Sequence, residues 1–166
     1  MNVIAHLLAP DGAIPNHPRW PLLIYPGAVA YPVPEEFEKI FALHRWPPAW
    51  RNGVHPFHHF HSNGHEVLGI YSGEVTVKFG GDKGVTVTAQ PGDVIVLPAG
   101  TGHKKLSSRG SLGVVGAYPE GQHPDTCVPP LARFKSNLKA IAAVPLPDCD
   151  PVLGVGGPLF DFWKPA

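Results

Sequence analysis

Five of the ten histidines of this chain lie in one short stretch, from residue 53 to residue 73. They are His55, His58, His59, His61 and His65. Histidine is the commonest metal ligand in proteins, and it is also the side chain that titrates nearest to neutral pH. The stretch is therefore the first candidate for a site with metal or acid–base chemistry.

Spacing selects two of these histidines as a pair. His59 and His61 are two residues apart, so on a strand both side chains point to the same face and can reach one ion at roughly 2.0–2.2 Å. Glu66 follows after Ser62-Asn63-Gly64, a turn that can bring the next strand back alongside the first. His103 comes after a glycine-containing turn much later in the chain and could supply a fourth ligand.

His65 is an alternative within the same stretch. If the turn does not reset the alternation of the strand, His65 rather than Glu66 faces inward together with His61. His65 is therefore interpreted either as an alternative ligand or as a residue that orients a ligand from outside the coordination sphere. His55 and His58 are expected to lie at the rim of the site or to bond to backbone groups.

A cavity beside the candidate ligands is expected to be mostly apolar. Counting along the strand that starts at Glu66 predicts the inward-facing side chains, and the neighbouring segments add others. The predicted pocket residues are Trp50, Arg51, Leu68, Ile70, Val94 and Val96. Arg51 could pair with a carboxylate or meet an anionic substrate. Such a cavity suits a small organic molecule held by a few polar contacts.

The segments that must position these residues read as short strands. Six β-rich segments recur at spacings of about ten residues, which indicates a sandwich or a small barrel. They span residues 67–71, 74–79, 85–88, 94–97, 103–106 and 112–118, with Ser72-Gly73 interpreted as a hairpin turn. Leu22 to Tyr25 could add a further strand, which the flanking Pro21 and Pro26 would confine to an edge of the sheet.

Two flanking helices are predicted, at about residues 35–44 and 131–143. In the first, Pro34 is followed by glutamates, which suits a helix start because the helix dipole favours negative charge there. In the second, apolar residues recur on one face. The aromatic C-terminus, which includes Trp163, is expected to pack on the barrel or on a second subunit.

Composition excludes several classes of protein. The 166 residues are expected to form one domain. Thirteen lysines and arginines balance thirteen aspartates and glutamates, so a nucleic-acid partner is not expected. The two cysteines, Cys127 and Cys149, are too few for a disulfide framework and are expected to be reduced. No signal peptide or membrane span is visible, so the expected location is the cytoplasm.

The spacing of glycines, histidines and Glu66 resembles the two motifs of the cupin superfamily. The first motif matches Gly53, His59, His61, Glu66 and Gly73, and the second matches Gly92, Pro98, Gly100 and His103. The asparagine that usually follows the second motif is Ser107 here, and it is not a ligand in the family pattern. Stretches such as PAGTGHK and VVGAYPEGQ resemble the small bacterial single-domain cupins of the YjlB-like kind over nearly the whole chain.

The resemblance implies an all-β double-stranded β-helix, the cupin jelly-roll barrel. Residues 1–166 would form a single cupin domain, with the barrel core at about 53–118 and both terminal extensions packed on it. The implied ligands are His59, His61, Glu66 and His103. They would hold one divalent transition metal ion per subunit, which could be Fe, Mn, Ni, Co or Zn. The alternative is a barrel that binds no metal.

Two functions fit such a site. Four protein ligands leave two positions free on an octahedral ion, which predicts a metal-dependent enzyme of the oxygenase or isomerase type acting on a small organic metabolite. The alternative is a non-catalytic cupin that binds a small molecule and uses a structural or ligand-orienting metal. A homodimer is expected, because two-fold dimers are the commonest assemblies and jelly rolls have edges to protect.

Overall fold

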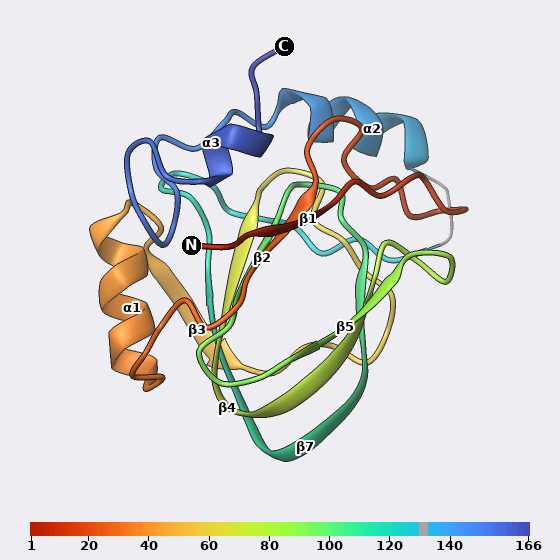
Figure 1. Ribbon diagram of the computed structural model, residues 1–166. Helices are drawn as coiled ribbons and strands as arrows, with labels where there is room; N and C mark the ends of the chain where they lie inside the picture. The colour runs from red at the N-terminus through yellow and green to blue at the C-terminus, as the bar shows by residue number, and fades with distance from the viewer. Residues whose placement is uncertain (130–132) are drawn as a thin grey trace.

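The computed structural model describes residues 1–129 and 133–166 and is organised around one curled antiparallel sheet (Figure 1). Neighbouring strands follow the order β1-β2-β6-β4-β7-β3, and β5 pairs with β4. The strands are β1 (Ile4–His6), β2 (Leu22–Tyr25), β3 (Pro48–Asn52), β4 (Glu66–Phe79), β5 (Val85–Ala89), β6 (Val94–Leu97) and β7 (His103–Ala117). This mostly β architecture confirms the predicted jelly-roll class.

Two strands are longer than the sequence predicts. The expected hairpin turn at Ser72-Gly73 is wrong, because β4 continues through it as one strand of 14 residues. Gly73 has a φ of 69°, and the pairing of β4 with β7 shifts register on both sides of Ser72. A bulge of this kind bends a strand without ending it. In the same way β7 is one bent strand of 15 residues rather than two short ones, as the lower part of Figure 1 shows.

Strand β2 lies inside the sheet, which corrects its expected edge position. It pairs with β6 on one side and with β1, an unpredicted strand, on the other. Pro21 and Pro26 fall just outside the paired residues Leu22–Tyr25, so neither proline has to donate a ladder hydrogen bond. The edge is formed instead by the short strand β1.

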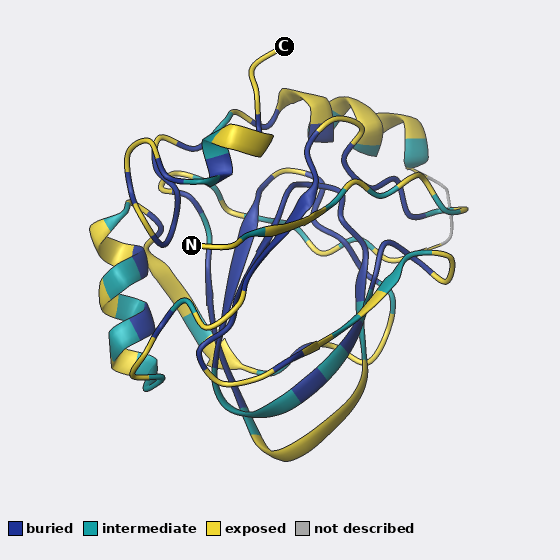
Figure 2. Ribbon diagram, in the orientation of Figure 1, coloured by how far each residue is buried: buried dark blue, intermediate teal, exposed yellow. Residues whose placement is uncertain are grey.

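Both faces of the central strands are buried (Figure 2). On strand β6, Val94 and Val96 pack in the outer layer beneath helix α1 and the C-terminal segment. The alternate residues Ile95 and Leu97 pack in the interior of the curled sheet. This double burial explains why the sequence of β6 is a continuous apolar run rather than an alternation.

The described residues form three helices, α1 (Pro34–Leu43), α2 (Phe134–Ala143) and α3 (Leu159–Phe162). The first confirms the predicted helix, and it packs closely because its Phe37 ring occupies the space that a Cβ on Gly69 would need. The second lies within the predicted range, whose first residues, Leu131 and Ala132, lie outside the described residues. No helix in the described part of the chain has the length and apolar character that crossing a membrane requires.

The aromatic C-terminus packs on its own chain. Trp163 is fully buried, its ring stacks on Trp20 at 5.4 Å between centroids, and its indole N–H donates to the carbonyl of Pro21 at 2.9 Å. Trp20 donates in turn to the carbonyl of Lys164 at 2.8 Å. The N- and C-terminal extensions are thereby clamped together over the outer face of the sheet.

Candidate metal centre

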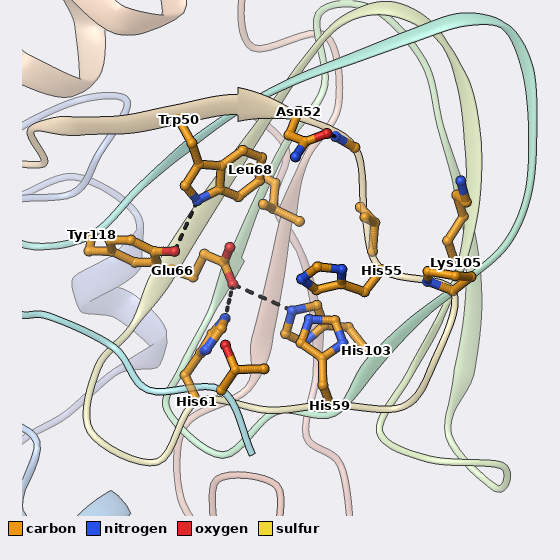
Figure 3. Close-up of a pocket in the computed structure, with 14 residues that line it drawn as sticks. Trp50, Asn52, His55, His59, His61, Glu66, Leu68, His103, Lys105 and Tyr118 are labelled. Carbon is orange, nitrogen blue, oxygen red and sulfur yellow. Dashed lines mark hydrogen bonds and ion pairs between the residues drawn. The ribbon is translucent and has the colours of Figure 1, made fainter. Parts of the chain in front are cut away.

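Three histidines meet at the inner face of the curled sheet. His59 and His61 precede β4, and His103 is the first residue of β7. Backbone hydrogen bonds between His59 and His103 in both directions, at 2.9 and 3.2 Å, hold the two segments together. One ligand atom from each of the three residues lies within 4.8 Å of the other two, and all three side chains are buried (Figure 3). The three histidines therefore form a cluster that could hold a metal ion.

Each histidine of this cluster uses Nδ1 as a donor to a backbone carbonyl. His59 Nδ1 bonds to the carbonyl of Phe57 at 3.0 Å, and His103 Nδ1 bonds to that of Thr101 at 3.0 Å. His61 Nδ1 bonds to the carbonyl of Asp125 at 2.5 Å. A hydrogen bond at one ring nitrogen fixes the tautomer and leaves the other nitrogen as the ligand atom. All three imidazoles therefore present Nε2 to the centre of the cluster.

The carbonyl that orients His61 comes from a remote loop. Asp125 is fixed there by its carboxylate, which accepts the backbone N–H of Ser62 at 2.7 Å and the Ser62 hydroxyl at 2.5 Å. Two backbone hydrogen bonds between Phe60 and Cys127, at 2.8 and 3.0 Å, hold the following residues of the loop against the segment that carries His59 and His61. His59 and His103 need no such loop, since each bonds to the residue two positions before it.

Replacing Asp125 should weaken metal binding without touching a ligand. In Asp125→Ala the loop loses its two bonds to Ser62, so the carbonyl that holds His61 is no longer fixed. We expect a loss of about 10- to 100-fold in metal affinity, the usual cost of removing a partner that orients a ligand. Competition with a chromophoric chelator measures it. Asp148→Ala, which removes only an exposed ion pair with Arg45, is the matched control, and equal affinities in both variants would contradict the assignment.

Glu66 completes the cluster from the first position of β4. Its Oε2 lies 2.7 Å from Nε2 of His61 and 3.4 Å from Nε2 of His103. Burial alone would raise the pKa of Glu66, but the charge of His61 and hydrogen bonds with His103 and His61 hold that pKa well below its usual range. Burial would likewise lower the pKa of His61, but the charge of Glu66 and its hydrogen bond raise it to about 9. The carboxylate is thus ionised beside the imidazoles.

The donor set fits a divalent transition metal ion. Burial, and secondly the charge of nearby His103, lower the pKa of His59 to about 3, so this imidazole is neutral at neutral pH. Neutral imidazole nitrogens with one carboxylate oxygen suit Fe, Mn, Ni, Co and Zn. A cation at the centre would also compensate the buried charge of Glu66, which a metal-free cluster balances by protonating His61.

A cavity of about 370 Å³ opens over the cluster. Its lining is more polar than the sequence predicts, because hydroxyl, amide and ammonium groups surround the apolar wall. The lining residues are Trp50, Asn52, Gly53, Val54, His55, Pro56, His59, His61, Glu66, Leu68, His103, Lys105, Tyr118 and Thr126.

Four residues expected in this lining lie elsewhere. Arg51 is exposed and pairs with Glu38 on helix α1. Ile70 is buried in the interior cluster that also contains Leu68, and it does not line the cavity. The expectation for Val94 and Val96 is wrong by one residue, because β6 pairs with β4 so that Glu66 lies opposite Leu97 and Leu68 opposite Ile95. Residues directly opposite each other share a face, so these two valines face outward.

His65 faces away from the cluster, into the outer layer of the molecule. Its Nδ1 accepts the backbone N–H of Ala99 at 2.9 Å, and its Nε2 bonds to the carbonyl of Pro145 at 3.0 Å. With both nitrogens in use and its ring packed against Trp20 and Trp163, it is not placed to act as a ligand. The turn at 62–64 therefore does reset the alternation in favour of Glu66.

The other two histidines of the stretch lie outside the cluster. His55 is exposed at the pocket mouth, where its ring stacks on Phe57 at 4.9 Å. His58 points to the opposite side and pairs with Asp82 at 2.7 Å. These positions agree with side-chain alternation along an extended segment, since His55 lies on the side of His59 and His61 and His58 on the opposite side.

Sequence reasoning missed Lys105 and Tyr118 as lining residues. Alternation along β7 could have identified both. Lys105 follows the ligand His103 by two residues and so shares its face. Gly116 lies opposite the lining residue Leu68, so Tyr118, two residues later, lies on that face as well. Gly116 is itself part of the site, because a Cβ there would lie 2.1 Å from the Trp50 ring. Asp125 carries no comparable signal, since its loop has no regular spacing relative to His61.

Comparison with known proteins gives three findings. Residues 50–109 match the family model described as a cupin domain. The chain is 41% identical over 153 residues to the uncharacterized protein YjlB of Bacillus subtilis (strain 168), and the match covers 92% of each chain. Among solved structures, a DUF861 family protein from Thermotoga maritima is similar, with 22% identity and a TM-score of 0.35 over 57% of this chain and 96% of that one.

Proposed function

We propose that this chain, which belongs to the cupin superfamily, is a metal-dependent enzyme. It would bind one divalent transition metal ion through His59, His61, His103 and Glu66 and act on a small organic metabolite in the adjoining cavity. An oxygenase or isomerase reaction is the class proposed. The predicted homodimer stays a prediction.

One observation carries this proposal. The three histidines direct Nε2 to one point, because each Nδ1 is already bonded to a backbone carbonyl. That arrangement lies at the floor of a cavity of about 370 Å³, a size typical of small-molecule sites. A buried structural metal needs no cavity beside it, whereas a catalytic metal does.

A metal ion bound there would supply Lewis acidity and, if it is iron or manganese, redox chemistry with O₂. The protein supplies the groups around it. Burial, and then the charge of Glu66, raise the pKa of Tyr118, so its hydroxyl stays protonated at neutral pH. That hydroxyl accepts the Trp50 indole N–H at 2.9 Å, which fixes its direction and leaves its own proton to donate to a substrate. Leu68 contributes to the apolar part of the cavity wall.

Metal content and reactivity test this proposal together. Protein purified without chelators is assayed for bound metals, then for oxygen uptake and for conversion of a panel of small organic acids, alcohols and ketones. Tyr118→Phe keeps the ring but removes the proton, so turnover should fall by about 100-fold, within the usual range for a general acid, while metal content stays unchanged. Tightly bound zinc with no turnover would instead favour a non-catalytic cupin that binds a small molecule.

A further inference from the structure

Lys105 brings a positive charge into the cavity wall. It lies on β7 two residues after His103 and therefore on the same face of the strand. Its backbone N–H donates to the carbonyl of His55 at 2.9 Å, which fixes the strand against the pocket mouth. Figure 3 shows Lys105 and Tyr118 on opposite sides of the histidine cluster. Among the lining residues Lys105 is the sole lysine or arginine, and Glu66 the sole acidic residue.

The charge of Lys105 is not neutralised by the surrounding structure. Within residues 1–129 and 133–166, no carboxylate forms an ion pair with its ammonium group. Arg51 provides the contrast, since this exposed arginine lies 2.5 Å from Glu38 and 3.5 Å from Glu35. Glu66 cannot balance Lys105, because its carboxylate is already engaged by His61 and His103. Lys105 as a whole is half-buried, and a positive charge in a cavity wall without a counter-ion attracts an anion.

Two neutral side chains of the lining, Asn52 and Tyr118, keep a free hydrogen-bond donor. Asn52 uses its side-chain oxygen to accept the backbone N–H of Gly53 at 2.9 Å, which leaves its NH₂ group for a ligand. Tyr118 accepts from Trp50 and retains its own proton. A ligand that complements these groups must be rich in hydrogen-bond acceptors. Carboxylate oxygens fit that description, and amines do not.

We infer that the pocket selects a small organic acid, and that Lys105 is the residue that recognises its carboxylate at the mouth of the cavity. The inference rests on the proposed function, since the other end of the molecule would reach the metal. A divalent ion, the carboxylate of Glu66 and the ammonium of Lys105 sum to a net positive charge, which attracts the anion. Lys105 is thus a specificity-determining residue rather than a metal ligand.

Succinate and its monoamide, succinamate, test this inference, because they have the same length and differ in one charge. Calorimetric titration of the zinc-loaded protein should show succinate binding about 10-fold more tightly, the usual worth of a hydrogen bond to a charged group. Lys105→Gln should remove that preference and Lys105→Arg should retain most of it. Lys83→Gln, which removes an exposed lysine from the turn before β5, is the matched control.

Equal affinities for the two ligands, or a preference that survives in Lys105→Gln, would overturn the inference. Bound metal is measured on the same samples, so a protein that binds none of Fe, Mn, Ni, Co and Zn refutes the proposed function separately. The titrations are repeated on zinc-free protein, where Glu66 is still balanced by His61. There Lys105→Gln should still bind succinate more weakly than the native protein does, and equal affinities of the two proteins would overturn the role of Lys105.

Discussion

The variant His103→Ala should lose the metal ion while keeping the fold. His103 contributes one of three converging Nε2 atoms and lies 3.9 Å from His59 between ring centroids. Its backbone bonds to His59 do not depend on the side chain, so the strand should stay in place. Loss of a residue that only orients a ligand costs up to about 100-fold in metal affinity. We expect a larger loss here, because a ligand itself is removed. Elemental analysis after dialysis against metal-free buffer measures it.

Thermal unfolding gives a second readout of the same change. A ligand that binds only the folded state adds about 4 kcal/mol at a concentration 1,000 times its Kd. Added metal should therefore raise the Tm of the native protein and leave that of His103→Ala nearly unchanged. The control is His6→Ala, which removes an imidazole from β1 at the edge of the sheet. Full metal occupancy in His103→Ala would refute the site.

Acid should destabilise the protein through His65, which lies outside the metal cluster. Complete burial lowers the pKa of His65 from 6.5 to about 3. Between pH 3 and pH 6.5, His65 therefore binds a proton in the unfolded chain but not in the folded chain. The stability linked to His65 is therefore fully present above pH 6.5 and is lost as the pH falls towards 3, at about 1.4 kcal/mol per pH unit and roughly 5 kcal/mol in all.

Replacing His65 by glutamine should flatten this dependence. His65→Gln is expected to be less stable at pH 7, because it loses ring packing on Trp20 and Trp163. Its deficit should shrink by about 1.4 kcal/mol for each pH unit below 6, since glutamine binds no proton. Urea unfolding at pH 7, 6 and 5 measures the slopes. The control is His123→Gln, in an exposed loop, whose free energy of unfolding should change with pH as that of the native protein does. The same pH dependence in His65→Gln would refute the role of His65.

Alternation along strands predicted much of the site and also explains where the prediction was wrong. It identified His59 and His61 as a pair, because residues two apart in an extended segment point to the same side whatever the rest of the fold is. It misplaced Val94 and Val96 because β6 is buried on both faces, and a continuous apolar run contains no alternation that shows which residues face inward. Only the pairing of Glu66 with Leu97 fixes that register.

Long-range contacts could not be predicted from the chain alone. The expected turn at Ser72-Gly73 has the residues of a hairpin, and only pairing with β7 shows that β4 continues through it. The link between Asp125 and His61 spans 64 positions through an irregular loop. Its acceptor is a backbone carbonyl, a group that every residue carries, so residue types give no signal for it.

The loop around Asp125 also sets the order in which the site can be assembled. All four candidate ligands lie before β7 ends at Ala117, so the emerging chain contains every metal-binding side chain before the loop is synthesised. His61 acquires its fixed orientation only when Asp125 has been made and docked on Ser62. We therefore expect tight metal uptake to be a late event in biosynthesis, because incomplete chains would bind the ion more weakly.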